Sequence, residues 1–313
     1  MSTAARILVT GASGLLGSNF ALQAAPRYEV VGITHLRPLH NPSFETLQAD
    51  LLAPGAVNAV LEAAKPDWVV HCAALANIDA CEKQPELARQ LNAELSGQLA
   101  RATAERSMRF LHVSTDAIFD GSKAPYKETD APNPLSVYGK TKRMAELAVK
   151  AAHPKWLIVR PNLFGWSLQG NHSLAEFFYN NLSAGTAVKG FTDRLFSPLH
   201  VGLLAEILLE LLEQDAHGIY HAGSRDSLSK YDFGVAIARR FGLDEQLVQP
   251  ANTEGAGAEA PRSADLRLNV SRLTQALGRQ LPSVADGIER LFVESQNGHR
   301  QTVQAMAAAV VKG

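Results

Sequence analysis

The chain has 313 residues, of which 46% are hydrophobic and 19% are charged, and its formal net charge is −1. This length suits one large domain with a further lobe, and the near-zero charge predicts no binding to nucleic acid polymers or anionic membranes. The longest apolar helix candidate, residues 201–212, contains two glutamates and is too short to cross a bilayer. Two cysteines, Cys72 and Cys81, are too few for a disulfide scaffold or a zinc site, so no metal and a reducing, cytoplasmic location are expected.

Short apolar runs alternate with helix-like patterns through the first half of the chain. The apolar runs predict strands at residues 7–9, 29–34, 67–72, 108–114 and 156–160, and the first starts too early to leave room for a signal peptide. Helical spacing predicts helices from residue 15 to the proline at 26, and at 55–64, 85–106 and 136–152, while 38–50 is rich in turns. This alternation predicts an α/β fold with a Rossmann-type, doubly wound parallel sheet.

Beyond residue 165 the pattern becomes looser. It predicts helices at 168–185, 199–213, 229–241, 271–277 and 284–292, a strand at 218–222, a surface loop over 250–264 and a helical or frayed tail beyond 295. There is no repeat and no sharp linker. We therefore expect residues 1–165, with 197–223 returning to them, to form the dinucleotide-binding domain. Residues 166–196 and 224–313 are expected to form a smaller, interwoven C-terminal substrate lobe.

A glycine-rich turn joins the first predicted strand to the first predicted helix. Gly11, Gly14 and Gly17 stand in a G-x-x-G-x-x-G spacing directly after the apolar run. A helix N-terminus offers unpaired N–H groups and a positive dipole end, and glycine lets a phosphate approach the backbone. The alternative is a turn that merely closes a strand–helix unit, but the context on both sides favours a dinucleotide cofactor.

The end of the second predicted strand indicates which cofactor. An acidic residue there would bind the ribose 2′-hydroxyl of NAD, and this chain has none at that place. Thr34, His35 and Arg37 suit a 2′-phosphate instead, which favours NADPH and leaves NADH open, although Arg37 could simply be a solvated loop arginine. Asp50 and Leu51, after the turn-rich run, are placed to reach the adenine.

Tyr138 and Lys142 are four residues apart, so a helix places them on one face about one turn apart. A tyrosine with its usual pKa of ~10 is a poor acid at neutral pH. A nearby ammonium and the positive nicotinamide of an oxidised cofactor would lower the pKa of Tyr138 and fit it to protonate a carbonyl during hydride transfer. The alternative is an exposed helix with a basic cluster that includes Lys140 and Arg143.

A third motif, Ser114, Thr115 and Asp116, follows a buried strand at its carboxyl end. Ligands of open parallel sheets bind at that edge, and a hydroxyl there can hydrogen-bond a substrate carbonyl. Alone, the motif would be interpreted as a turn or helix cap. Two further residues are weighed for substrate contact: Trp166 could stack on a sugar, and Arg262, like Arg225, could bind a diphosphate.

Together these stretches resemble a known family. Residues 10–17, 71–74, 114–115, 138–142 and 160–162 resemble the motifs of the extended short-chain dehydrogenase/reductases. Within that family, residues 76–82, 113–121 and 126–142 are most similar to the dTDP-4-dehydrorhamnose reductase group, which acts in dTDP-rhamnose biosynthesis. The resemblance runs from about residue 5 to 292.

The resemblance implies roles for individual residues. Tyr138 would be the proton donor, Lys142 would bind the nicotinamide ribose, and Thr115 would hold the carbonyl. Asn92 would support this catalytic set through a water or backbone contact. The remaining implied cofactor contacts are Gly11, Ser13, Gly14, Leu15, Leu16, Gly17, Ala73 and Ala74. The residues implied to face the sugar are Asn77, Asp116, Phe119 and Asn162.

We therefore expect an NADPH-preferring reductase of a nucleotide-linked 4-keto sugar. Asn19 stands where the family has a glutamate of a metal-linked dimer contact, which argues against both that metal and that dimer contact. A homodimer is nevertheless the general expectation for the family. One alternative is an NAD-dependent sugar-nucleotide epimerase or dehydratase, against which Ala117 counts because it supplies no second carboxylate. The other is a non-catalytic NADP-binding regulatory subunit, against which the intact Thr115, Tyr138 and Lys142 argue.

Overall fold

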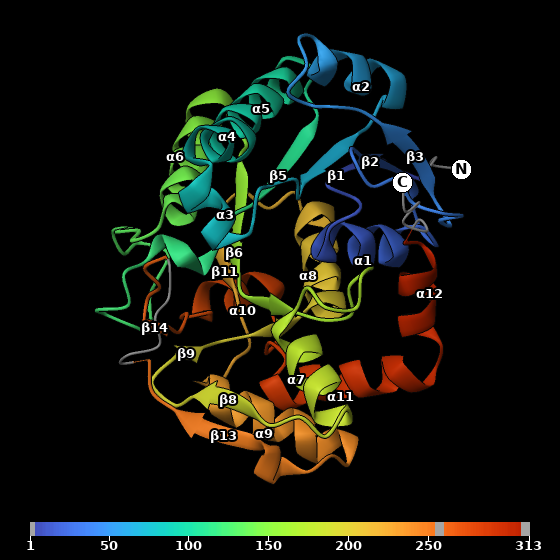
Figure 1. Ribbon diagram of the computed structural model, residues 1–313. Coiled ribbons are helices and arrows are strands. Elements are labelled where there is room, and N and C mark those ends of the chain that lie inside the picture. Colours follow the sequence, from blue (N-terminus) through green and yellow to red (C-terminus); the bar gives the residue numbers. More distant parts are fainter. Residues whose placement is uncertain (1–3, 254–259, 308–313) are drawn as a thin grey trace.

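A computed structural model describes residues 4–253 and 260–307, and its centre is a seven-stranded sheet (Figure 1). The strands run in the order β11-β6-β5-β4-β1-β2-β3, and every pairing is parallel. Their bounds are β1 Arg6–Thr10, β2 Glu29–Thr34, β3 Glu45–Gln48, β4 Trp68–His71, β5 Arg109–Val113, β6 Leu157–Pro161 and β11 Gly218–Ala222. The order reverses between β1 and β4, which confirms the doubly wound sheet and puts its ligand crevice there.

Helices cover both faces of this sheet. On one face lie α1 (Leu15–Ala24) and α8 (Val201–Glu213), which pack together; on the other lie α2 (Ala56–Ala64), α5 (Leu95–Glu105) and α6 (Val137–Ala152). Successive strand residues point to opposite faces of the sheet. Ile7 and Val9 pack in the core on the side of α1 and α8, and Leu8 packs in the core on the side of α2 and α5. Because both faces are buried, the strands are apolar without alternation, which is why they were recognisable in the sequence.

The helix predicted at 85–106 is interrupted by a wider turn. It consists of α4 (Pro85–Ala88), the π-helical η1 (Arg89–Glu94) and α5, after the short α3 (Ile78–Lys83). Such single π turns recur at functional sites. Here the turn contains Asn92, whose side chain is buried.

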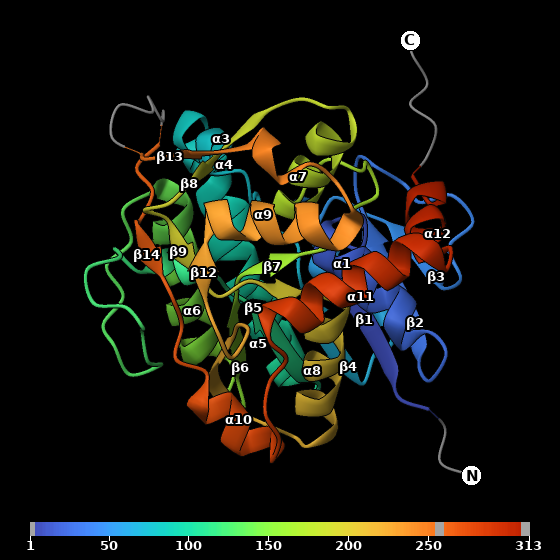
Figure 2. The same cartoon turned by 90° about the horizontal axis from the view of Figure 1, so that it is seen from below.

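The smaller lobe lies below the sheet in Figure 1 and has its own core, which includes Phe164, Phe178, Phe196 and Phe233. Its helices are α7 Leu174–Ser183, α9 Lys230–Phe241 and α11 Val284–Gln296, with the 3-10 turn η3 Glu245–Leu247. Its strands are β7 Leu163–Phe164, β8 Val188–Phe191, β9 Leu195–Phe196, β10 Leu199–His200, β12 Leu228–Ser229, β13 Val248–Ala251 and β14 Asp265–Leu266. Two further helices, α10 Ser271–Leu277 and α12 His299–Ala305, contribute Leu273 and Val303 to the core of the large sheet. Figure 2 shows α9 and α11 side by side across this lobe.

Four predicted elements differ from the structure. The turn-rich stretch 38–50 contains β3, an edge strand whose residues are only partly buried and therefore lack an apolar run. The helix predicted from 168 begins at Leu174, because Ser173 caps it in a capping box with Glu176. The helix predicted from 199 begins at Val201, because β10 pairs with β7 first. The predicted loop 250–264 begins within β13, and its residues 254–259 lie outside the described chain.

The other strand and helices predicted for the second half agree with the structure. The strand at 218–222 is β11, and the helices at 229–241, 271–277 and 284–292 correspond to α9, α10 and α11. The last of these continues to Gln296, and α12 follows in the predicted tail. Among residues 4–253 and 260–307, no helix is both long and apolar enough to cross a membrane.

Candidate active site

The glycine turn after β1 is shaped for a phosphate. Gly11 has a φ of +70°, and a Cβ there would lie 2.8 Å from the backbone of Ala73. A Cβ on Gly17 would collide with the carbonyl oxygen of Gly11. No side chain caps α1 at Gly14, so the helix N-terminus and its N–H groups face the crevice. These residues fit the diphosphate of a dinucleotide.

The other predicted cofactor residues lie around this crevice. Ala73 and Ala74 follow β4, next to β1, and the Ala73 N–H donates to Thr10 Oγ1 at 3.2 Å. Thr34 ends β2 and is buried, whereas His35 and Arg37 are exposed in the loop beyond it. The remaining cofactor candidates are Ser13, partly buried at the turn; Leu15 and Leu16, in the first turn of α1; Asp50, whose Oδ1 accepts from the Leu52 N–H; and Leu51, buried in the core.

Thr115 and Tyr138 line one cleft of about 380 Å³ between the large sheet and the smaller lobe, together with Asp116 and Asn162. Thr115 follows β5 and caps the 3-10 turn η2 (Asp116–Ile118), with its Oγ1 accepting from the Ala117 N–H at 3.1 Å. Gly139 allows α6 to approach this turn, because a Cβ there would collide with the Ala117 carbonyl oxygen. The glycine after Tyr138 therefore sets the distance between the tyrosine and the threonine turn.

Lys142 lies one turn beyond Tyr138 on α6, and its side chain is buried. Its Nζ donates to the Val113 carbonyl at 2.6 Å and lies 3.4 Å from Nε2 of His112. Asn92 connects the same helix to the loop after β4: its Nδ2 donates to Thr141 Oγ1 at 3.0 Å, and its Oδ1 accepts from the Leu75 N–H at 2.8 Å. The structure thus brings Asn92, Thr115, Tyr138 and Lys142 around one end of the sheet.

The pKa of Tyr138 differs from the sequence expectation. Burial raises it to about 12, and an interaction with Thr115 opposes that rise. Burial also lowers the pKa of Lys142 to about 8. The sequence predicted that Lys142 would lower the pKa of Tyr138. This effect is absent because the Lys142 ammonium donates to the Val113 carbonyl, so desolvation dominates the pKa of Tyr138.

Asp116 is a buried carboxyl in the same cleft. Its Oδ2 accepts from Asn162 Nδ2 at 2.6 Å, and its Oδ1 accepts from Thr115 at 3.2 Å. Burial raises the pKa of Asp116 to about 6, against the lowering effect of these hydrogen bonds and of Lys230. The cleft therefore holds a carboxyl that titrates near neutral pH beside the hydroxyl of Thr115.

Two residues expected to face the sugar are placed elsewhere. Phe119 is fully buried and stacks on Tyr126 with 4.1 Å between ring centroids, and Trp166 is fully buried with its Nε1 donating to the Leu291 carbonyl at 3.1 Å. Neither lines the cleft, so both expectations are wrong: at each place the chain turns its large apolar ring into a core. Asn77 caps α3 through the Ala80 N–H, while its neighbours Ala76 and Ile78 line the cleft.

The smaller lobe contributes three cations to the cleft: Arg194, Lys230 and Arg262. Burial and the charges of both arginines lower the pKa of Lys230. Arg194 donates to the carbonyl of Arg262, whose guanidinium contacts Asp79 at 2.9 and 3.0 Å. The sequence indicated Arg262 as a possible diphosphate contact. It did not identify Arg194 and Lys230, because neither residue belongs to a local motif. Arg225 lies outside this cleft, 3.3 Å from Asp286.

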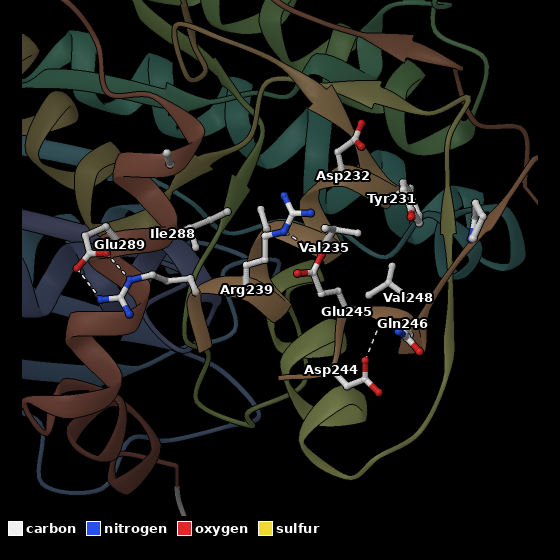
Figure 3. A pocket seen from close by; sticks show the side chains of 14 residues that line it. Tyr231, Asp232, Val235, Arg239, Asp244, Glu245, Gln246, Val248, Ile288 and Glu289 are labelled. Carbon is white, nitrogen blue, oxygen red and sulfur yellow. Dashed lines mark hydrogen bonds and ion pairs between the residues drawn. The ribbon is translucent and has the colours of Figure 1, made fainter. Parts of the chain in front are cut away.

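A larger groove of about 1130 Å³ lies in the smaller lobe between α9, β13 and α11 (Figure 3). It is lined by ion pairs that satisfy one another, such as Arg239 with Glu245 at 2.8 Å, and by none of the predicted site residues. Within the described ranges, no three His, Cys, Asp or Glu side chains gather as metal ligands. Asn19 stands where the family has a metal-linked contact, and here it donates to the Leu15 and Trp166 carbonyls and lies 3.3 Å from His299.

A doubly wound sheet with this glycine turn, and a Tyr-x-x-x-Lys helix beside a threonine at a strand's carboxyl end, define the extended short-chain dehydrogenase/reductase class. Proteins of this class bind a nicotinamide nucleotide. The chain belongs to the RmlD substrate binding domain family, which matches residues 5–297.

Relatives and solved structures agree with this placement. The chain is 33% identical over 291 residues to a probable low-salt glycan biosynthesis reductase of Haloferax volcanii, covering 90% of this chain and 96% of that one. It is also 33% identical over 288 residues to methionine adenosyltransferase 2 subunit beta of Bos taurus, covering 88% and 84%. The structure of dTDP-4-dehydrorhamnose reductase from Bacillus anthracis in complex with NADP superposes with a TM-score of 0.82 at 26% identity, covering 93% of this chain and 100% of that one.

Proposed function

We propose that the protein is an NADPH-preferring reductase of a 4-keto sugar attached to a nucleotide. The observation that carries this proposal is the shared cleft of Thr115, Tyr138, Asp116 and Asn162, at the sheet edge where the glycine turn also lies. A hydroxyl to hold a carbonyl and a hydroxyl to protonate it meet there, which is what reduction of a ketone requires. The two free thiols suit a reducing, cytoplasmic setting.

The chain's own residues perform four tasks. The glycine turn and the α1 N-terminus bind the diphosphate of the cofactor, which supplies the hydride when bound. Thr115 rotates its hydroxyl from Asp116 to the keto oxygen and orients it. Tyr138 gives its proton to that oxygen as the hydride reaches the carbon, so that a hydroxyl forms. To favour the phenolate that remains on Tyr138, the Lys142 ammonium turns from the Val113 carbonyl, which it contacts in this structure, towards the ring.

The lobe side of the cleft favours an anionic substrate. Arg194, Lys230 and Arg262 converge there, opposite the catalytic hydroxyls. Guanidinium groups bind phosphate oxygens in pairs, so a sugar carried on a nucleoside diphosphate would place its diphosphate on these cations and its keto group at Thr115. The preference for NADPH rests on Arg37, exposed beyond β2, and on the absence of a carboxylate at the end of that strand.

A spectrophotometric assay of NADPH oxidation against a panel of 4-keto nucleotide sugars tests this proposal. We expect turnover with at least one member and its loss in Tyr138→Phe. Turnover by Tyr138→Phe at the wild-type rate would contradict the mechanism. An epimerase or dehydratase would convert its substrate without net consumption of cofactor, so the same assay separates that alternative.

A second candidate is a regulatory subunit, and the likeness to methionine adenosyltransferase 2 subunit beta favours it. Thr115 and Tyr138 line one cleft and Lys142 lies one helix turn beyond Tyr138, and this arrangement argues for catalysis instead. Absence of turnover on every sugar nucleotide, together with stoichiometric capture of a partner enzyme, would support the regulatory role.

A further inference from the structure

Lys142 is surrounded by groups from β4, β5 and its own helix, α6. Its ammonium contacts the Val113 carbonyl and lies near His112, both on β5, and its side chain is only 2% exposed. Burial lowers its pKa to about 8, close to the pH at which the protein would work. A small change in its surroundings therefore decides whether it carries the charge that Tyr138 needs.

Most titratable neighbours of Lys142 are neutral at physiological pH. Burial holds the pKa of His112 far below its usual value and lowers that of His71 to about 3. Burial likewise raises the pKa of the Cys72 thiol to about 12. The two imidazoles and the thiol thus present no charge to the ammonium from β4, β5 or the loop after β4.

Glu146 differs from these neighbours because it is charged. It lies one turn beyond Lys142 on α6 and is fully buried. Burial alone would raise its pKa, but Arg160, Ser114 and Arg143 bring it below the usual value. The carboxylate in turn raises the pKa of Lys142 against the effect of burial.

The carboxylate of Glu146 is held in place from two strands and its own helix. It accepts hydrogen bonds from Arg160 Nε at 2.7 Å and Nη2 at 2.8 Å, from Ser114 Oγ at 2.7 Å, and from Arg143 Nη1 at 3.0 Å. The Ser114 hydroxyl is committed to this bond, whereas the neighbouring Thr115 lines the cleft. Tyr138, Lys142 and Glu146 follow one another at four-residue steps along one face of α6.

We propose that Glu146 is a positioning residue that keeps Lys142 in its ammonium form, and that Ser114 and Arg160 hold the carboxylate for this purpose. The proposal deepens the reductase function proposed above and rests on it, because it concerns the same Tyr138–Lys142 pair. Glu146 touches neither substrate nor cofactor; it acts through the charge of Lys142. Without it, burial would drive Lys142 towards the neutral amine.

The test follows the titration of Lys142 directly. Protein labelled with ¹³C at the lysine ε-carbons is titrated by NMR from pH 6 to 10, and Lys142→Arg identifies the Lys142 signal. We expect a midpoint near 8 in the wild type and a midpoint at least about one pH unit lower in Glu146→Gln. An unchanged midpoint in a folded variant would overturn the proposal.

Two further variants control for misfolding and for a nonspecific effect of removing a carboxylate. Glu146→Gln leaves Arg160 buried without its partner, so if it does not fold, Glu146→Gln combined with Arg160→Met replaces it. Its midpoint should fall as well, but by less, because this variant also removes the positive charge of Arg160. Glu105→Gln, an exposed carboxylate at the end of α5, is the matched control and should leave the midpoint unchanged.

A kinetic measurement separates this inference from the proposed function. The alkaline limb of kcat against pH should move down by the same interval as the NMR midpoint, with values at pH 6 within about threefold of wild type. A merely structural role would lower kcat at every pH and leave the limb in place. If the NMR midpoint moves but no sugar nucleotide is reduced, the proposed function fails while the inference stands.

Discussion

The two sides of the cleft are built differently. On the sheet side, Lys142 and Glu146 are buried and fixed by hydrogen bonds to strands and helices, and Thr115 is held in its turn. On the lobe side, Arg262 is 36% exposed and its partner Asp79 belongs to the other half of the molecule. Proton transfer tolerates little misplacement, whereas recognition of a flexible anion benefits from side chains that can adjust.

This difference separates chemistry from specificity. The buried side is built on β5, β6 and α6. The lobe side presents its cations from loops and from the first turn of α9. We expect substitutions there to alter ligand binding more than turnover, because loops tolerate change and the sheet does not.

The largest expected effect comes from the sheet side. Tyr138→Phe removes the proton donor and should lower kcat by at least ~10²-fold, the low end for a general acid. Binding of NADPH, followed by cofactor fluorescence, should stay close to wild type, because the phenyl ring keeps the packing. Full activity in this variant would refute the assignment of Tyr138.

On the lobe side, Arg262→Ala should act on binding. Loss of a charge-assisted contact of about 1.5 to 3 kcal/mol should raise KM by roughly 10- to 100-fold while kcat changes only a few-fold. Steady-state kinetics with the nucleotide sugar measure both. Arg225→Ala, outside the cleft, is the control; a kcat loss in Arg262→Ala as large as that in Tyr138→Phe would break the contrast between the two sides.

A third variant examines the far end of the cofactor. Arg37→Ala removes the cation expected to meet the 2′-phosphate and should reduce the preference for NADPH over NADH by about tenfold, the effect of one such contact. The ratio of kcat/KM for the two cofactors measures it. If that ratio does not move, Arg37 does not bind the 2′-phosphate.

The smallest effect concerns Asp116, where the two sides meet. Its folded pKa of about 6 exceeds the usual 3.8, so the folded protein binds more protons than the unfolded chain between these values, and wild-type stability falls as pH rises from about 4 to 6. Asp116→Asn escapes this loss and should be more stable at pH 7.5 by about 1 to 2 kcal/mol, although less active. Urea unfolding at pH 4.5 and 7.5 checks it, since a stability difference that does not grow with pH would contradict the buried charge.

Parts of the site were readable from the sequence because each depends on neighbours along the chain. The Gly11 turn follows a strand directly, and Tyr138 and Lys142 share one helix face by their spacing. Thr115 could be added because carboxyl ends of parallel strands meet at one sheet edge. Trp166 and Phe119 were misplaced for the opposite reason: proximity to a strand end does not say whether a ring points into the cleft or into a core.

The sequence alone therefore determined the doubly wound sheet, the glycine turn and the order of the catalytic motifs, since periodicity and spacing are local. Tertiary structure decided the rest. It set Ser114 on Glu146 and placed Thr115 in the cleft, and it brought Arg262 to Asp79 across 183 residues. Contacts of this kind depend on how the smaller lobe packs against the sheet, and burial, which governs the pKa values of Tyr138, Lys142 and Asp116, exists only once that packing is complete.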